Sequence, residues 1–337
     1  MFFIQLRNLF KSYGPVRALN GLNLEVPKGS LYGLLGPNGA GKSTAIRIIC
    51  TLIAPDSGHV EVGGHDAFRE EKEIRRSLGY VAQDVAIDKI LTGRELLQLQ
   101  GDLYHLDSKH KKKRIDELIQ RLDMHEWIDR RCGSFSGGMK RRLDLASGLL
   151  HEPELLILDE PTVGLDIESR SVIWGLLKEL RRNETTILLS SHYLEEVDEL
   201  ADEMAIIDKG KVIASGKPDD LKKELGGDRV TLRVREFSDE VEAESVRKLI
   251  KNINGVSNVV VNQTQGYSLN FLVQSNDVIS NLSSHLSKEN FEVFALSHSR
   301  PSLDDVYLQA TGKTLMDAEL ELAGKRDFKL ESKKSMR

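Results

Sequence analysis

The nine residues Gly36-Pro37-Asn38-Gly39-Ala40-Gly41-Lys42-Ser43-Thr44 decide the fold of this 337-residue chain. They satisfy the pattern G-x-x-x-x-G-K-[ST], in which glycines let backbone N–H groups converge on phosphate oxygens. The stretch 31–35 before them is apolar and predicts a buried strand, and a helix is expected from Lys42 to about Leu52. Such a helix adds the positive end of its dipole to the loop. The motif therefore predicts an α/β domain that binds a nucleotide, with Lys42 on its β- and γ-phosphates and the Ser43 hydroxyl on Mg²⁺.

A second buried strand ends in two adjacent carboxylates. The apolar run 155–158 is followed by Asp159 and Glu160. Packing does not explain two acids there, because an unpaired buried charge is costly. Asp159 suits a contact to Mg²⁺, directly or through water, and Glu160 suits a general base for the attacking water. Together with the phosphate loop, this strand end predicts nucleotide hydrolysis.

A second glycine-bearing helix start follows at Ser136-Gly137-Gly138. The N-terminus of a helix is an anion site. One γ-phosphate does not need two such sites from one chain, so the second site points to a dimer in which another copy supplies it. Taken alone, this short sequence is equally compatible with an ordinary loop.

Composition excludes several classes. The net charge is −5, with 47 basic and 52 acidic side chains, which argues against a protein that mainly neutralises nucleic-acid phosphates. We find no apolar run of membrane-spanning length and expect no signal peptide. Cys50 and Cys132 are far apart in sequence and indicate a reducing, cytosolic compartment. No cysteine–histidine spacing suggests zinc.

Glycine usage marks a domain boundary, since 23 of the 27 glycines lie within residues 1–227. Before it we expect a cassette with half-buried antiparallel strands at 3–6 and 22–26, and buried parallel strands at 155–158 and 186–189. A helical subdomain is expected at about 84–150. Within it, Thr92 and Glu95 form a capping-box pattern, and the basic run 109–114 is read as a solvated helix start.

The second domain, 228–312, has the order βαββαβ of a ferredoxin-like fold, with its last strand expected at 291–296. Residues 313–337 are expected to form a charged, partly ordered or frayed tail.

Residues 1–225 resemble the ATP-binding subunits of ABC transporters. The matching segments follow the family's order. Beyond the two motifs above, they are Ser134–Met139 (signature), Gln83 (Q-loop), Gly164-Leu165-Asp166 (D-loop), Ser190-Ser191-His192 (switch histidine) and Tyr13, which is similar to the adenine-stacking aromatic. Phe135 and Met139 depart from the commoner Leu and Gln, and Met139 has no glutamine amide for a polar contact across the dimer. The stretch 135–170 and, less specifically, 301–308 are similar to the daunorubicin-resistance branch.

The resemblance implies a P-loop ABC cassette with a RecA-like core, an antiparallel β subdomain and a helical subdomain. It also implies two chains closing head to tail around two ATP molecules and Mg²⁺. Gln83 and His192 then join Glu160 in catalysis, Gln83 joins Ser43 and Asp159 near the metal, and Asp166 lies across the dimer. The partners implied are a second copy and a separately encoded membrane permease, with the chain peripheral on the cytoplasmic face of the membrane, powering export of a drug-like or lipid substrate.

Two rival interpretations stay open. One is a soluble ABC-type ATPase that acts on DNA or ribosomes, although such relatives usually carry two cassettes or a long coiled coil. The other makes the second domain a ligand sensor that gates the ATPase, which its fold alone does not establish. The substrate is not specified, because its contacts would lie mainly in the membrane subunit.

Overall fold

The computed structural model describes residues 1–235, 239–262 and 266–321. The chain divides into two compact units, 1–213 and 214–337. The division falls earlier than the glycine-based boundary near Gly227. One reason is that helix α8 (Pro218–Glu224) contacts helix α11 (Leu303–Thr311) within the second unit.

The first unit is built on a six-stranded sheet with the order β10-β9-β3-β8-β7-β6. Strands β3, β7 and β8 are buried along their whole length, as expected for parallel strands covered on both faces. Because β3, β7 and β8 pair in parallel, their carboxyl ends lie at one edge of the sheet. The strands are β3 (Leu31–Leu35), β6 (Leu78–Val81), β7 (Leu155–Asp159), β8 (Thr186–Ser191), β9 (Glu203–Asp208) and β10 (Lys211–Gly216).

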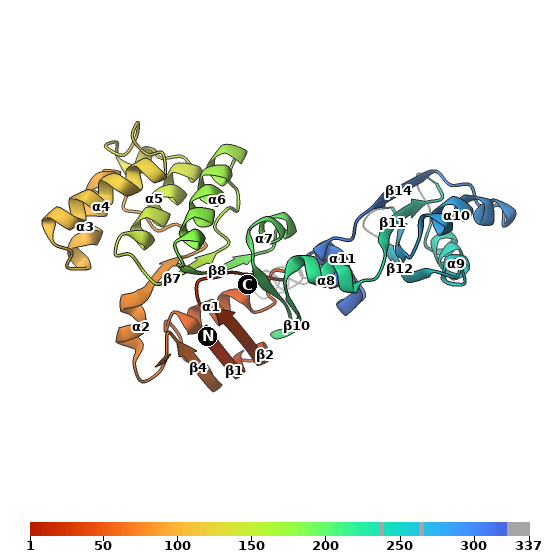
Figure 1. Cartoon of the computed structure of the whole chain (residues 1–337), viewed down its shortest axis with the longest axis horizontal. Coiled ribbons are helices and arrows are strands. Elements are labelled where there is room, and N and C mark those ends of the chain that lie inside the picture. Colours follow the sequence, from red (N-terminus) through yellow and green to blue (C-terminus); the bar gives the residue numbers. More distant parts are fainter. Residues whose placement is uncertain (236–238, 263–265, 322–337) are drawn as a thin grey trace, which may run out of the picture. The chain divides into compact units, whose positions relative to one another are not determined.

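A separate antiparallel sheet with the order β2-β1-β4-β5 confirms the half-buried strands expected near the N-terminus. Its strands are β1 (Phe2–Tyr13), β2 (Val16–Pro27), β4 (Ser57–Val62) and β5 (His65–Asp66). Apolar residues of β1 and β2 pack with those of helix α1 (Lys42–Ile49) in one core. Figure 1 shows this sheet on the side of the first unit away from α3, α4 and α5.

Helix α2 (Glu71–Ser77) precedes β6. The helical segment after β6 contains α3 (Gly93–Leu103), α4 (Ser108–Arg121), a 3-10 turn (Cys132–Ser134) and α5 (Gly137–Leu149). Thr92 and Glu95 form the expected capping box. The basic run opens α4 and is largely exposed, except for Arg114, which is buried. Helices α6 (Ile167–Arg182) and α7 (Leu194–Leu200) complete this unit. Within the described ranges, no helix is both long and apolar enough to cross a bilayer.

The second unit contains a four-stranded sheet with the order β12-β13-β11-β14, and all three pairings are antiparallel. This confirms the ferredoxin-like topology. Its core elements are β11 (Asp228–Arg233), α9 (Glu240–Lys251), β12 (Val256–Asn262), β13 (Ser268–Val273), α10 (Asn276–Lys288) and β14 (Ala295–Ser299).

One expectation for this unit needs revision. The last strand begins at Ala295 and not at Phe291, because Phe291 and Val293 pack against the core from a loop without pairing. Where the tail is described, residues 315–321 are helical, with Leu315 and Ala318 buried. The rest of the tail lies outside the described residues.

Candidate nucleotide-hydrolysis site

The phosphate loop joins β3 to α1 through two positions where only glycine fits. A Cβ on Gly36 would lie 2.2 Å from the carbonyl oxygen of Ile207, and one on Gly41 would lie 2.6 Å from that of Ala18. Gly41 also has a φ of 114°, which side chains other than glycine rarely adopt. The loop thus packs tightly against neighbouring backbone. The tip residues Asn38 and Gly39 are exposed, whereas Pro37 and Ala40 are buried.

Lys42 is the first residue of α1 and is buried inside this loop. Its Nζ donates to the carbonyl oxygens of Gly36, at 2.6 Å, and Pro37, at 3.2 Å. The same ammonium lies 3.7 Å from the Glu160 carboxylate. Lys42 therefore places a cation at the loop, where phosphate is expected. Thr44 follows in the first turn and is half-buried.

Asp159 ends β7 beside the phosphate loop. Ser43 Oγ donates to Asp159 Oδ1 at 3.3 Å, and Ser190 Oγ donates to the same oxygen at 2.5 Å. The sequence predicted that Ser43 and Asp159 lie near each other, and this contact agrees with that prediction. The hydroxyl of Ser190, at the end of β8, is an addition that the motif order did not assign.

Glu160 is the point where the predicted catalytic residues meet. Gln83, just after β6, donates from Nε2 to Glu160 Oε2 at 3.0 Å. His192 Nδ1, just after β8, lies 3.3 Å from Glu160 Oε1. Burial alone would raise the pKa of the Glu160 carboxyl, but the contacts with His192 and Lys42 outweigh burial and hold that pKa below its ordinary value. Glu160 is therefore ionised at neutral pH, as a general base requires.

The backbone of Glu160 is strained. Its φ of 50° lies in the left-handed region, which costs a residue other than glycine about 1–3 kcal/mol. The Glu160 N–H donates to the Ser190 carbonyl oxygen at 3.1 Å and lies 3.2 Å from Ser190 Oγ. Strain of this kind persists only where the surroundings enforce it, and here it fixes the direction of a carboxylate that three motifs contact.

The signature and D-loop residues form a second group. Ser136 caps α5 by accepting the Met139 N–H at 3.3 Å, and both Ser136 and Gly137 are exposed. Gly138 is buried, and a Cβ there would lie 2.2 Å from Ser169 Oγ. Asp166 caps α6 by accepting the Ser169 N–H at 2.7 Å. Ser169 therefore links the signature to the D-loop of the same chain.

Tyr13 ends β1 with 47% of its surface exposed, and Lys11 Nζ lies 5.7 Å from the centre of its ring. An exposed aromatic ring is available for stacking.

A buried contact that the sequence did not indicate connects α7 to the loop after Glu160. Thr162 Oγ1 donates to Glu196 Oε1 at 2.7 Å, and the Trp174 indole donates to the same oxygen at 3.2 Å. No sequence signal singled out Glu196, because four of the seven residues of α7 are acidic.

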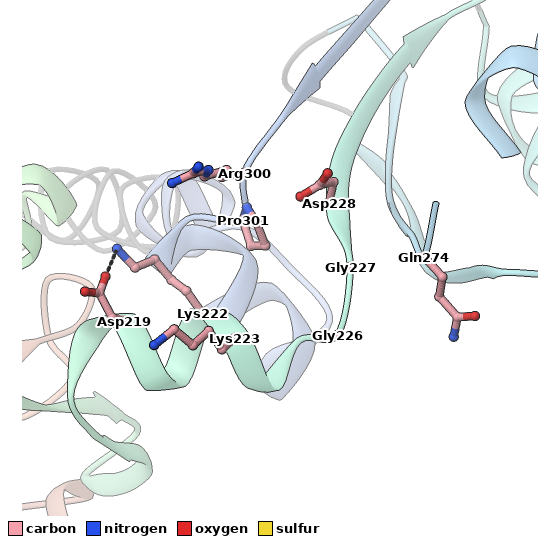
Figure 2. Close-up of a pocket in the computed structure, with 9 residues that line it drawn as sticks. All are labelled: Asp219, Lys222, Lys223, Gly226, Gly227, Asp228, Gln274, Arg300 and Pro301. Atoms are coloured by element: carbon pink, nitrogen blue, oxygen red, sulfur yellow. Dashed lines mark ion pairs between the residues drawn. The ribbon is translucent and has the colours of Figure 1, made fainter. Parts of the chain in front are cut away.

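The second unit has a cavity of about 630 Å³ between α8, the glycine pair 226–227 and the end of β14, drawn in Figure 2. Its described lining includes Lys222, Lys223 and Arg300 but none of the motif residues. Its charges are partly balanced, since Lys222 lies 3.0 Å from Asp219, and Asp228 lies 2.9 Å from His298.

A buried lysine lies in a glycine-rich loop, and a hydroxyl and a carboxylate oxygen lie beside it. The ionised glutamate is contacted by a glutamine and a histidine. These contacts define a P-loop ATPase. Comparison with known proteins agrees. The ABC transporter family model matches residues 19–163, and the model for the C-terminal domain of DrrA1-3-like ATP-binding proteins matches residues 216–311.

Relatives match along most of the chain. The daunorubicin resistance ATP-binding protein DrrA3 of Streptomyces coeruleorubidus is 40% identical, over 90% of this chain and 93% of its own. The linearmycin resistance ATP-binding protein LnrL of Bacillus subtilis is 36% identical, over 93% of this chain and 100% of its own. The chain belongs to the ATP-binding subunits of ABC transporters, in the daunorubicin-resistance branch, and it is an ATPase.

Solved structures agree on the cassette. A structure of an ATP-binding subunit of an ABC transporter has a TM-score of 0.62 and 28% identity, over 66% of this chain and 93% of its own. The dimeric cassette MJ0796, in a post-hydrolysis state bound to ADP and Pi, has a TM-score of 0.59 and 26% identity, over 64% of this chain and 98% of its own.

Proposed function

We propose that two copies of this chain close head to tail around two ATP molecules and power export of a drug-like or lipid substrate through a separately encoded membrane subunit. The observation that carries the proposal is the meeting of Lys42, Gln83 and His192 on the one carboxylate of Glu160. In this account the chain works at the cytoplasmic face of the membrane, bound to its permease, and cassette 1–227 does the hydrolysis. Domain 228–312 is an accessory or regulatory module.

Glu160 acts as the general base that takes a proton from the attacking water. Its carboxylate is ionised at neutral pH for the reasons given above. Lys42 stabilises the charge that develops on the phosphates, and His192 holds the γ-phosphate and the geometry of the water. Gln83 contacts the base directly, so movement of its loop reports the state of the nucleotide to the membrane partner.

Mg²⁺ fits the oxygen atoms beside the phosphate loop. Ser43 Oγ and Asp159 Oδ1 are 3.3 Å apart, and hydroxyl and carboxylate oxygens are the ligands that Mg²⁺ prefers. We assign Ser43 and Asp159 to hold the ion, with the Gln83 side chain near it. When bound, Mg²⁺ neutralises phosphate charge.

The signature group supports the dimer. Ser136, Gly137 and Asp166 are all exposed, although Ser136 and Asp166 each cap a helix inside the chain. Beside Asp166, Ile167 is 86% exposed. A helix start with an exposed hydroxyl and an exposed glycine, those of Ser136 and Gly137, is suited to a phosphate of the opposing copy. The neighbouring apolar side chain is suited to burial in an interface.

The export part of the proposal comes from the relatives, whose names describe resistance to daunorubicin and to linearmycin. Resistance by an ATP-binding subunit implies that ATP hydrolysis drives the compound out of the cell. The test is affinity capture of the full chain from membranes of its native cell. Recovery of a multi-helix membrane protein supports the proposal, whereas recovery of ribosomes or DNA without a membrane protein supports the rival soluble ATPase.

Dimerisation has its own test. We expect Glu160→Gln protein to dimerise when ATP is added, because it holds ATP without splitting it, and expect Glu160→Gln/Ser136→Arg protein to stay monomeric. Sedimentation velocity with and without ATP measures the change, and the same Glu160→Gln protein with ADP is the control. A monomer at saturating ATP would contradict the head-to-tail arrangement.

Tyr13 is expected to stack on adenine. Tyr13→Ala should weaken ATP binding by about 5- to 150-fold, since stacking of a base on an aromatic ring contributes about 1–3 kcal/mol. Tyr13→Phe keeps the ring face and should stay within about twofold of the wild type. Titration with a fluorescent ATP analogue measures both. Equal affinity in all three proteins would remove Tyr13 from the site.

A further inference from the structure

Arg141 lies on α5, the helix that begins at the signature sequence, and its guanidinium is buried with 3% of the residue exposed. The side chain makes three bonds to backbone carbonyls that belong to other elements. Nε donates to Pro161 at 2.8 Å, Nη2 donates to Asp159 at 3.0 Å, and Nη1 donates to Ala82. A planar guanidinium with five fixed donors is suited to holding several acceptors at once.

These three carbonyls flank the catalytic residues. Asp159 and Pro161 are the neighbours of Glu160 on either side, and Ala82 immediately precedes Gln83. Glu160 itself has the left-handed φ of 50°, so its backbone needs support from outside its own strand. The bonds from Arg141 supply that support on both sides of the strained residue, at the peptide group between Asp159 and Glu160 and at the peptide group that follows Pro161.

We propose that Arg141 is a positioning residue for ATP hydrolysis: through these carbonyls it holds Glu160 and Gln83 in their mutual contact. Arg141 touches neither side chain, and it acts through the backbone of both. The inference deepens the proposed function, because it rests on Glu160 as the base and Gln83 as its neighbour.

The position of Arg141 on α5 also connects the signature sequence with the backbone at Glu160. Ser136 caps the start of α5, and Arg141 follows on the same helix. A shift of the signature end of α5 therefore moves the guanidinium and, with it, the backbone at Glu160. Nearby, Asp144 Oδ2 lies 3.5 Å from Arg141 Nη1 and provides the guanidinium with a partly buried counter-charge.

Arg114 provides a matched control. It is also buried, on α4, and its Nη2 also donates to a backbone carbonyl of α5, that of Leu149, at 3.2 Å. Its other partners are Glu117 and Glu152, outside the motifs. Replacing Arg114 with glutamine removes a buried guanidinium of the same kind without touching the backbone at Glu160.

The experiment compares full-length Arg141→Gln, Arg141→Lys, Arg114→Gln and wild-type protein by kcat and KM for ATP, ATP dissociation constant and thermal unfolding. We expect Arg141→Gln to lower kcat by about 10- to 100-fold, the scale of a misplacement of about 1 Å at a catalytic group. KM and the dissociation constant should stay within about twofold, because Lys42 and the phosphate loop are unchanged. Arg141→Lys keeps a charge and some donors, so its kcat should lie between the two.

A kcat within about twofold of wild type in Arg141→Gln overturns the inference, and so does an equal loss of kcat in Arg114→Gln. If Arg141→Gln does not fold, Arg141→Lys decides: a kcat lowered at least threefold at unchanged KM supports the inference, and a wild-type kcat overturns it. Glu160→Gln measured in parallel separates the two proposals. Full hydrolysis there removes the proposed base, whereas wild-type hydrolysis in the Arg141 variants removes only the positioning role.

Discussion

Glu160→Gln is expected to keep ATP binding and to lower hydrolysis by about 100-fold or more, the scale of a lost general base. Glutamine keeps the shape of the side chain and can still contact Gln83 and His192, but it cannot accept a proton from water. Steady-state phosphate release, with ATP affinity measured on the same preparation, checks both halves of the expectation.

The control for this variant is Glu195→Gln, which changes an exposed glutamate on α7 and should hydrolyse ATP at the wild-type rate. The pH profile adds a second check. Because the pKa of Glu160 is held below its ordinary value of 4.5, the base stays ionised through the neutral range, and its activity is lost only as pH falls below that value. Undiminished hydrolysis in Glu160→Gln would exclude this residue as the base.

Lys42→Ala has the second large expected effect, a loss of ATP affinity of about 10- to 150-fold. Hydrogen bonds to charged groups contribute about 1.5–3 kcal/mol, and each 1.4 kcal/mol is a factor of ten in affinity. The substitution also removes a cation 3.7 Å from the buried Glu160 carboxylate, so hydrolysis at saturating ATP should fall too.

Isothermal titration with ATP measures the affinity of Lys42→Ala. Lys28→Ala is the matched control, because Lys28 is exposed and pairs with Glu154 at 3.6 Å, away from the motifs. If Lys42→Ala bound ATP as tightly as the Lys28 variant, the phosphate loop would not be the nucleotide site.

The sequence predicted those parts of the site that short local motifs specify. Glycine spacing and the two acids after a buried strand identified strand ends, whereas His192 was assigned from the family resemblance and its place in the order of motifs. Parallel pairing then brings Lys42, Asp159 and His192 to one edge of the sheet. The ferredoxin-like unit was predictable for the same reason, since periodicity identifies each of its strands and helices.

What the sequence did not indicate depends on long-range contacts of single side chains. Arg141 lies in an ordinary basic run, and its proposed positioning role depends on its hydrogen bonds to the backbone carbonyls of residues 82, 159 and 161. Likewise, Glu196 follows another glutamate on α7, and only the fold brings Thr162 to it. The start of β14 was also missed, because apolar alternation at 291–294 packs a loop as well as a strand.

Hydrolysis of ATP with Glu160 as the base, at the site built by the phosphate loop, leaves a simple chemical trace. After incubation with ATP and Mg²⁺, the nucleotide that Glu160→Gln protein retains is extracted and identified by chromatography. We expect ATP in the variant and ADP in the wild type. ADP in both, formed at comparable rates, would contradict the role of Glu160 as the base.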